Sequence, residues 1–146
     1  MKKLITIICF TLFYSLTLSA QENIDSREKI KALKVSYITE QLNLTPREAE
    51  KFWPIYNAYS KEQYALRNKL KSEIKNSIKN DINAVSEKEA ERLIVLKLTT
   101  DKKFYESQKS FIENIKKVIS YKKIIQLQLA EMEFGRKLMR KYKHRK

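Results

Sequence analysis

Residues 44–59 read LTPREAEKFWPIYNAY, and this stretch predicts both the start and the packed face of a long helix. Thr45 is a favourable N-cap because its hydroxyl can accept a hydrogen bond from a free N–H of the first turn. Pro46 suits the first helical position, and Glu48 can complete a capping box with Thr45. Leu44, just before the cap, can act as the apolar half of a hydrophobic staple. We therefore expect a helix cap formed by Leu44, Thr45, Pro46 and Glu48.

Aromatic side chains follow this cap at helical spacing. Phe52, Tyr56 and Tyr59 fall on one face of a helix, and Trp53 widens that face. Pro54 stands inside the pattern and removes one backbone hydrogen bond, so we expect a kink in the helix rather than its end. We call Phe52, Trp53, Tyr56 and Tyr59 the aromatic knot, and we expect the other helices to pack around it.

The rest of the chain alternates helical patterns with short polar connections. One apolar stripe precedes the cap, and the stripe of the capped helix continues to about Ile78. A third stripe follows Ser86 and reaches Ile119, and Ser120 can cap a fourth helix. Only one glycine and two prolines occur in 146 residues, which argues against a turn-rich β fold. We expect an all-α fold of about four helices, with long kinked helices in an open hairpin or bundle.

Several single residues carry specific expectations. Ser86 and Glu89 have the spacing of a second capping box. Leu33 and Ile94 fall on the apolar stripes of the first and third helices, which predicts that both are buried. Gly135 interrupts the fourth helix, and close approach of another helix explains it better than a functional hinge does.

The N-terminus has the pattern of a signal peptide. Lys2 and Lys3 form a basic segment, residues 4–18 are largely apolar, and Ala20 is a small residue suited to signal peptidase. We expect residues 1–20 to be removed after Ala20, which would leave a single helical domain of residues 21–146 in the periplasm or outside the cell. An uncleaved membrane anchor is the alternative. Cleavage would remove the only cysteine and lower the formal charge from +14 to +12.

The composition argues against an enzyme. The chain has one histidine, His144, near its C-terminus, and no glycine-rich phosphate loop. With no cysteine after the signal peptide, pairs of nucleophile and base are absent. Met132 and Met139 are better explained as core residues than as metal ligands. We therefore expect no catalytic residues, no bound metal and no cofactor.

Positive charge is the feature that best suggests a function. Basic residues recur along the later helices, interleaved with tyrosines, although solvated helix faces and half-buried rings would give the same pattern. Cationic heads beside amphipathic rings can hold exposed segments of another protein. Acidic surfaces of the cell envelope are a second possible partner, and nucleic acid is not expected for an exported protein. The candidate client-binding residues are Tyr64, Lys69, Lys71, Lys75, Tyr105, Arg140 and Lys141.

Two segments resemble a known family. LTPREAEKFWPIYNAYSKE resembles the first LTxxQ-type motif of the periplasmic Spy/CpxP family, and especially of small secreted proteins labelled sensors of ECF-type sigma factors. ISYKKIIQLQLAEMEFGRKLMRKY resembles the closing helix of that group, with Ala130, Glu131 and Phe134 at its centre. Glu48 replaces the glutamine of the first motif. Lys123 stands at the matching position of the second, where it cannot accept a hydrogen bond from the Ser120 N–H.

The resemblance covers most of the chain after residue 25 and implies a role in envelope stress. In that role the protein would bind unfolded polypeptide without ATP, as a holdase-like chaperone, and we expect it to be a homodimer. The alternative is a regulatory sensor in an envelope-stress or sigma-factor pathway that binds a membrane-bound partner. A purely structural envelope protein is a third possibility.

Overall fold

The computed structural model describes residues 28–79 and 81–143, and within these residues it contains helices and no strands. The predicted all-α fold is thus confirmed. The predicted signal peptide and His144 lie outside the described residues. The chain divides into two compact units, one from Leu44 to Gln126 and the other formed by the residues before and after it.

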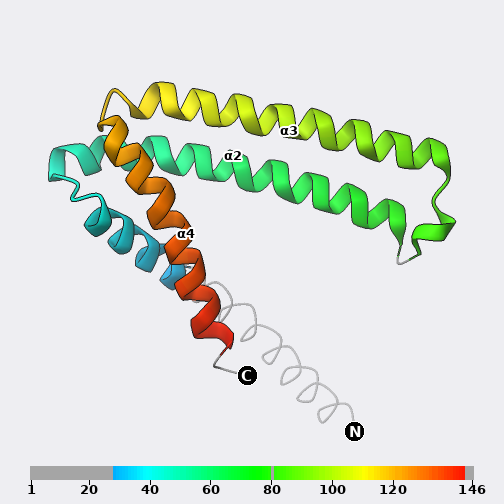
Figure 1. The fold of residues 1–146 in the computed structure, drawn as a ribbon, viewed down its shortest axis with the longest axis horizontal. Coiled ribbons are helices and arrows are strands. Elements are labelled where there is room, and N and C mark those ends of the chain that lie inside the picture. Colours follow the sequence, from blue (N-terminus) through cyan, green and yellow to red (C-terminus); the bar gives the residue numbers. More distant parts are fainter. Residues whose placement is uncertain (1–27, 80, 144–146) are drawn as a thin grey trace, which may run out of the picture. The chain divides into compact units, whose positions relative to one another are not determined.

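The helices are long and are joined by short connections (Figure 1). Their bounds are residues 28–41 for the first helical segment, Pro46–Ile78 for α2, Glu87–Ile115 for α3 and Tyr121–Lys143 for α4, with a short 3₁₀ helix, η1, at Ile82–Ala84. The expected span of the second helix is confirmed, and the helix continues through Pro54. The third helix ends at Ile115, so Val118 and Ile119 belong to the turn before α4 and not to the helix.

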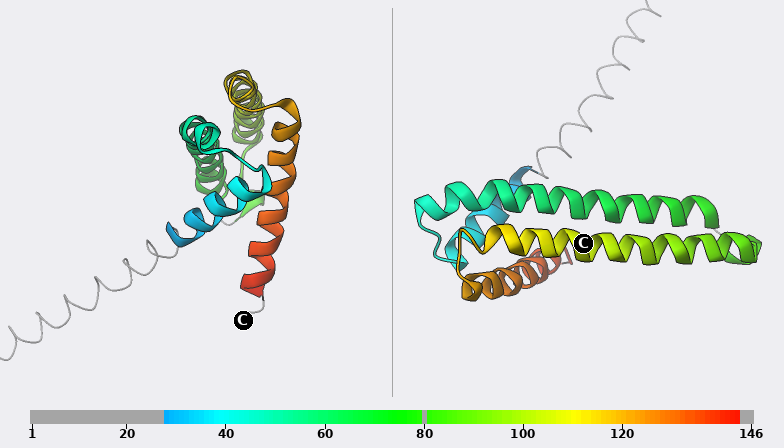
Figure 2. Two further views of the ribbon diagram at one scale, coloured as in Figure 1. Left: turned by 90° about the vertical axis from the view of Figure 1, so that its left-hand side faces the viewer. Right: turned by 90° about the horizontal axis from the view of Figure 1, so that it is seen from above.

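Helices α2 and α3 form an antiparallel hairpin and lie side by side along their length (Figure 2). The rings of Tyr59 and Phe111 stack with their centroids 4.3 Å apart. Further along the hairpin, the Gln63 side-chain amide donates to the Phe104 carbonyl at 3.4 Å, and Arg92 Nη1 lies 3.5 Å from a carboxylate oxygen of Glu73. These contacts fix which residues of the two helices lie at the same level.

The start of α2 has the capping box that the sequence predicts. The Thr45 hydroxyl accepts from the Glu48 N–H at 3.2 Å, and the Glu48 carboxylate accepts from the Thr45 N–H at 2.9 Å. Pro46 occupies the first turn, and Asn43 supplies the preceding turn with a φ of 45°, a conformation that asparagine tolerates well. The prediction of how this helix begins is therefore confirmed.

Ser120 caps α4, and Lys123 replaces the second half of a capping box with a different bond. The Ser120 hydroxyl accepts from the Lys123 N–H at 3.3 Å. The Lys123 ammonium donates to the Glu48 carboxylate at 2.7 Å. Glu48 is thus shared by the start of α2 and the start of α4, although the two helix starts are far apart in the sequence.

The aromatic knot forms the packed centre of the near half of the hairpin, where α2 begins and α3 ends. Phe52 and Tyr56 are buried with their rings stacked at 5.5 Å, whereas Trp53 and Tyr59 are half-buried. Trp53 packs edge-on against both Phe52 and Tyr56. The knot is therefore a core feature, with Trp53 at its rim.

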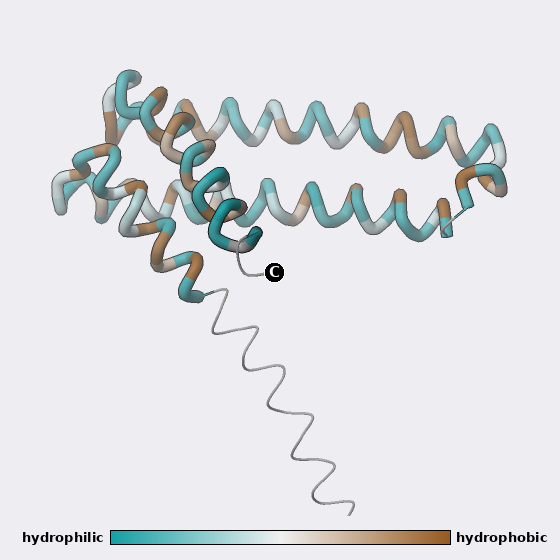
Figure 3. Tube along the Cα trace, turned by 60° about the horizontal axis from the view of Figure 1, so that its bottom comes forward, coloured by the Kyte–Doolittle hydropathy of each residue, from teal (hydrophilic) through white to brown (hydrophobic). Residues whose placement is uncertain are grey.

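The structure corrects the expected Ser86–Glu89 capping box and two of the expected core positions. Only half of the Ser86 box forms, because the Glu89 carboxylate turns away from it and bonds to Arg92. Leu33 and Ile94 are exposed. The buried face of α3 instead includes Thr100, whose hydroxyl bonds to the carbonyl four residues before it, and Ser107. Figure 3 shows apolar residues at intervals along the length of α3.

Two expectations for α4 are also wrong. Met132 and Met139 are exposed rather than core residues, because the buried side of this helix carries Ile124, Leu127 and Ala130. A Cβ added to Gly135 would meet nothing within 4 Å, so no close neighbour requires a glycine there.

The unit that joins residues 28–43 to the chain from Leu127 onward is held by mixed polar and apolar contacts. Ile38 and Leu42 are buried in it. Tyr37 donates to the Glu133 carboxylate at 2.8 Å, and its ring lies 4.4 Å from the Lys137 ammonium. Lys34 bonds to Glu131 at 3.2 Å.

Candidate functional site: two faces of the α2–α3 hairpin

The candidate residues on α2 do not share one face. At about 100° per residue, Tyr64, Lys71 and Lys75 lie within about 40° of one another around the helix axis. Lys69 is rotated by at least about 120° from all three. All four side chains are exposed. The structure thus groups Tyr64 with Lys71 and Lys75, and separates Lys69 from them.

Tyr105 lies at the same level of the hairpin as Tyr64. The bond from Gln63 to the Phe104 carbonyl fixes this level. Around the axis of its own helix, each tyrosine lies about 120–130° from the line of contact with the other helix. The direction of this rotation is the same in both helices. In an antiparallel pair, equal senses of rotation place both side chains on the same side of the hairpin.

Two aliphatic residues of α3 extend this surface. Ile94 and Leu98 share the helix face of Tyr105, and the antiparallel register places Ile94 between the levels of Lys71 and Lys75 and Leu98 within about two residues of the level of Lys71. We call Tyr64, Lys71, Lys75, Ile94, Leu98 and Tyr105 the Tyr64 face. Tyr64, Ile94, Leu98 and Tyr105 are 61%, 59%, 62% and 65% exposed, respectively. Large apolar side chains that are more than half exposed, at one surface and beside lysines, are typical of a protein-binding surface.

Arg140 and Lys141 belong to the other compact unit. They are exposed residues of the last turn of α4, where basic side chains interact favourably with the helix dipole. That local role explains their presence without a client. The structure therefore does not join these two residues to the Tyr64 face.

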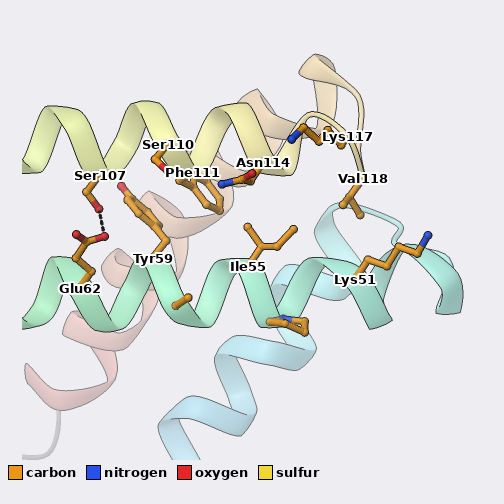
Figure 4. A pocket seen from close by; sticks show the side chains of 12 residues that line it. Lys51, Ile55, Tyr59, Glu62, Ser107, Ser110, Phe111, Asn114, Lys117 and Val118 are labelled. Atoms are coloured by element: carbon orange, nitrogen blue, oxygen red, sulfur yellow. Dashed lines mark hydrogen bonds between the residues drawn. The ribbon is translucent and has the colours of Figure 1, made fainter.

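The opposite side of the hairpin contains an open groove of about 840 Å³. Its floor is made by Ile55, Tyr59 and Phe111, and Lys51 and Lys117 stand at one end (Figure 4). At the other end, the Ser107 hydroxyl donates to the Glu62 carboxylate at 2.6 Å. The sequence alone does not predict this groove, because its residues come from two helices whose register the sequence does not give.

Two carboxylates of the hairpin, Glu89 and Glu48, are paired with cationic side chains. The Arg92 guanidinium bonds to both carboxylate oxygens of Glu89 and, helped by the Ser77 hydroxyl, lowers the pKa of Glu89 to about 2. Bonds from the Lys123 ammonium and the Thr45 N–H lower the pKa of Glu48. Both shifts come from ion pairs at helix ends.

The described residues contain no group of three or more histidine, cysteine, aspartate or glutamate side chains placed to hold a metal ion. Among the same residues, no helix is both long enough and apolar enough to span a membrane. The arrangement offers surfaces for binding: an exposed apolar and cationic face, and a groove behind it.

Comparison of the chain with models of protein families, with curated proteins and with solved structures gives no match.

Proposed function

We propose that the protein binds unfolded polypeptide without nucleotide, as a holdase-like chaperone, and that the Tyr64 face is the binding surface. The observation that carries this proposal is the group of four exposed large apolar side chains beside Lys71 and Lys75. Unfolded chains expose apolar and acidic segments together. A surface with both kinds of partner can capture such segments by charge and hold them by apolar contact.

The test is suppression of aggregation, followed by light scattering of an acidic client that unfolds on dilution. We expect the wild-type protein to slow aggregation without ATP, and moderate salt to weaken the effect, because exposed charges are screened beyond about 8 Å at physiological ionic strength. Leu98→Gln combined with Tyr105→Gln should remove most of the suppression. Unchanged scattering with excess wild-type protein at low salt would overturn the proposal.

The lysines of α2 provide a matched pair of variants. Lys71→Gln with Lys75→Gln should slow client capture, because both lysines belong to the Tyr64 face. Lys69→Gln should have little effect, because this lysine is equally exposed but lies on another side of the same helix. Equal effects of the two variants would show that net charge, and not this surface, governs capture.

The regulatory alternative is the second outcome of the same experiments. A sensor would not suppress aggregation of unrelated clients, yet the Leu98→Gln and Tyr105→Gln variant would lose binding to one membrane-bound signalling protein. Pull-down from solubilised envelope membranes, with this variant as the control, distinguishes the two functions.

We also propose that the protein is exported and acts as a homodimer in the periplasm. Export is supported by the pattern of residues 1–20, and mass spectrometry of the exported protein should find Gln21 as its first residue. Dimerisation is supported by exposed apolar residues outside the Tyr64 face, Val95, Ile125 and Leu129 among them, and sedimentation at micromolar concentration should give twice the mass of the chain. An exported protein that retains residues 1–20 would contradict the first proposal. A sedimentation mass of one chain would contradict the second.

A further inference from the structure

The groove on the side of the hairpin opposite the Tyr64 face has the dimensions of a ligand site. Its volume of about 840 Å³ is within the usual range of pockets that bind small molecules or short peptides. Lys51 and Glu62, which line its two ends, are eleven residues apart on α2 and so about 16 Å apart along the helix. An extended chain of about five residues has this length.

The floor of the groove is apolar and fixed in place. Ile55 comes from α2, and the stacked rings of Tyr59 and Phe111 join the two helices across it (Figure 4). Phe111 is buried, and its ring also packs edge-on against Tyr56 of the aromatic knot. A floor held by these contacts is preformed, so a ligand would lose little free energy in ordering it.

Charge is distributed unequally along the groove. Lys51 and Lys117 lie at the same end, and the acidic residue of the lining, Glu62, lies at the other. Lys117 is supplied by the turn after α3, whereas Lys51 is part of α2, so two separate segments bring positive charge to the same end of the groove. This end is complementary to an anionic group, and the Glu62 end is not.

The α3 wall is polar where the floor is apolar. Ser110 and Asn114 present a hydroxyl and an amide to the groove, between its charged ends. An acyl chain would cover these groups without offering hydrogen bonds, which is unfavourable. The backbone of an extended peptide can bond to them while its apolar side chains meet the floor.

We propose that this groove binds an extended peptide segment in which an aromatic or large aliphatic residue precedes an acidic one. The acidic side chain lies between Lys51 and Lys117, and the apolar side chain rests on Ile55 and Tyr59. The groove is separate from the Tyr64 face, so this site does not depend on the proposed chaperone activity. It gives the protein a preference for sequence in addition to general capture of unfolded chains.

The proposal is tested by fluorescence anisotropy with the purified protein and a labelled peptide, Gly-Ser-Leu-Ser-Phe-Asp-Asp amide. We expect saturable binding that weakens with salt. A peptide with asparagine in place of both aspartates should bind about fivefold or more weakly, since solvent-exposed ion pairs each contribute modestly. Equal binding of the two peptides would overturn the proposal.

Variants of the groove localise the binding. Lys51→Gln with Lys117→Gln should weaken binding of the acidic peptide and leave the asparagine peptide unchanged. Lys61→Gln with Lys109→Gln is the matched control, because these exposed lysines lie on the same two helices outside the groove. Ala58→Trp, which fills the groove from its wall, should abolish binding of both peptides. Circular dichroism establishes that each variant is folded, and equal affinities of the two lysine variants would place the peptide elsewhere.

Discussion

The two ends of the α2–α3 hairpin are held together in different ways. At the near end, where α2 begins and α3 finishes, Phe52, Tyr56, Phe111 and Ile115 are buried, and the ring of Tyr56 contacts those of Phe52 and Phe111. In the far half, Leu93 is the only buried apolar residue that the structure describes between Gln63 and Phe104. The ion pair of Arg92 with Glu73 and its bond to the Ser77 hydroxyl join the helices there.

This difference explains why Ile94 and Leu98, in the far half of the hairpin, are exposed. A two-helix hairpin can bury only the line along which the helices meet, and nothing else in the described unit covers the other sides of the far half. Ile94 and Leu98 are therefore left exposed, as a binding surface requires. In the near half, the contact between the buried rings of Tyr56 and Phe111 joins the two helices.

The largest predicted effect is the loss of a buried ring at the near end. Phe52→Ala should lower the free energy of unfolding by about 3–5 kcal/mol, the usual cost of removing a fully buried phenylalanine. Leu93→Ala in the far half should cost about 2 kcal/mol, because its surroundings are less completely packed. Urea denaturation measures both. Equal losses would mean that the two halves are equally well packed.

The N-cap of α2, at the near end, should contribute more to stability than the N-cap of α3, at the far end. Thr45→Ala should lower the free energy of unfolding by about 1 kcal/mol, the typical cost of losing an N-cap. Ser86→Ala should cost less, because Glu89 does not complete the capping box and remains bonded to Arg92. Thermal unfolding by circular dichroism compares them, with Ser72→Ala on the exposed surface of α2 as the control. A larger loss for Ser86→Ala would contradict the comparison.

Lys79, the residue that follows α2, offers a gain in stability at the far end. Lys79 has a φ of 45°, a left-handed conformation that costs energy for any residue with a Cβ. Lys79→Gly should therefore stabilise the fold by about 0.5–1 kcal/mol. Asn43→Gly, at the same φ before the near end, should gain less, because asparagine tolerates this conformation. Chemical denaturation of the two variants tests this order.

Acid should weaken the far end through Glu89. Its pKa in the folded protein is about 2, below the ordinary value of 4.5, so its contribution to stability is complete above about pH 4.5 and is lost as the pH falls towards 2. Between these values, the melting temperature of the wild type should fall more steeply than that of Glu89→Gln. Parallel curves would show that the Arg92 ion pair does not contribute.

The sequence predicted local features well and the pairing of helices poorly. The Thr45 cap and the burial of Phe52 follow from spacing along one helix, and both are confirmed. The exposure of Ile94 depends on which side of α3 faces α2, and a helix with apolar residues on two sides leaves that choice open. The groove was missed for the same reason. Lys123 shows a third limit, because its partner, Glu48, belongs to another helix.

The bond between Glu48 and Lys123 has a consequence for the kinetics of folding. It joins residues 75 positions apart, so it closes a large loop and can form only after the hairpin has brought the two helix starts together. An interaction made after the transition state affects mainly the unfolding rate. Lys123→Met should therefore speed unfolding and leave the folding rate nearly unchanged, so that this one ion pair lengthens the lifetime of the native protein.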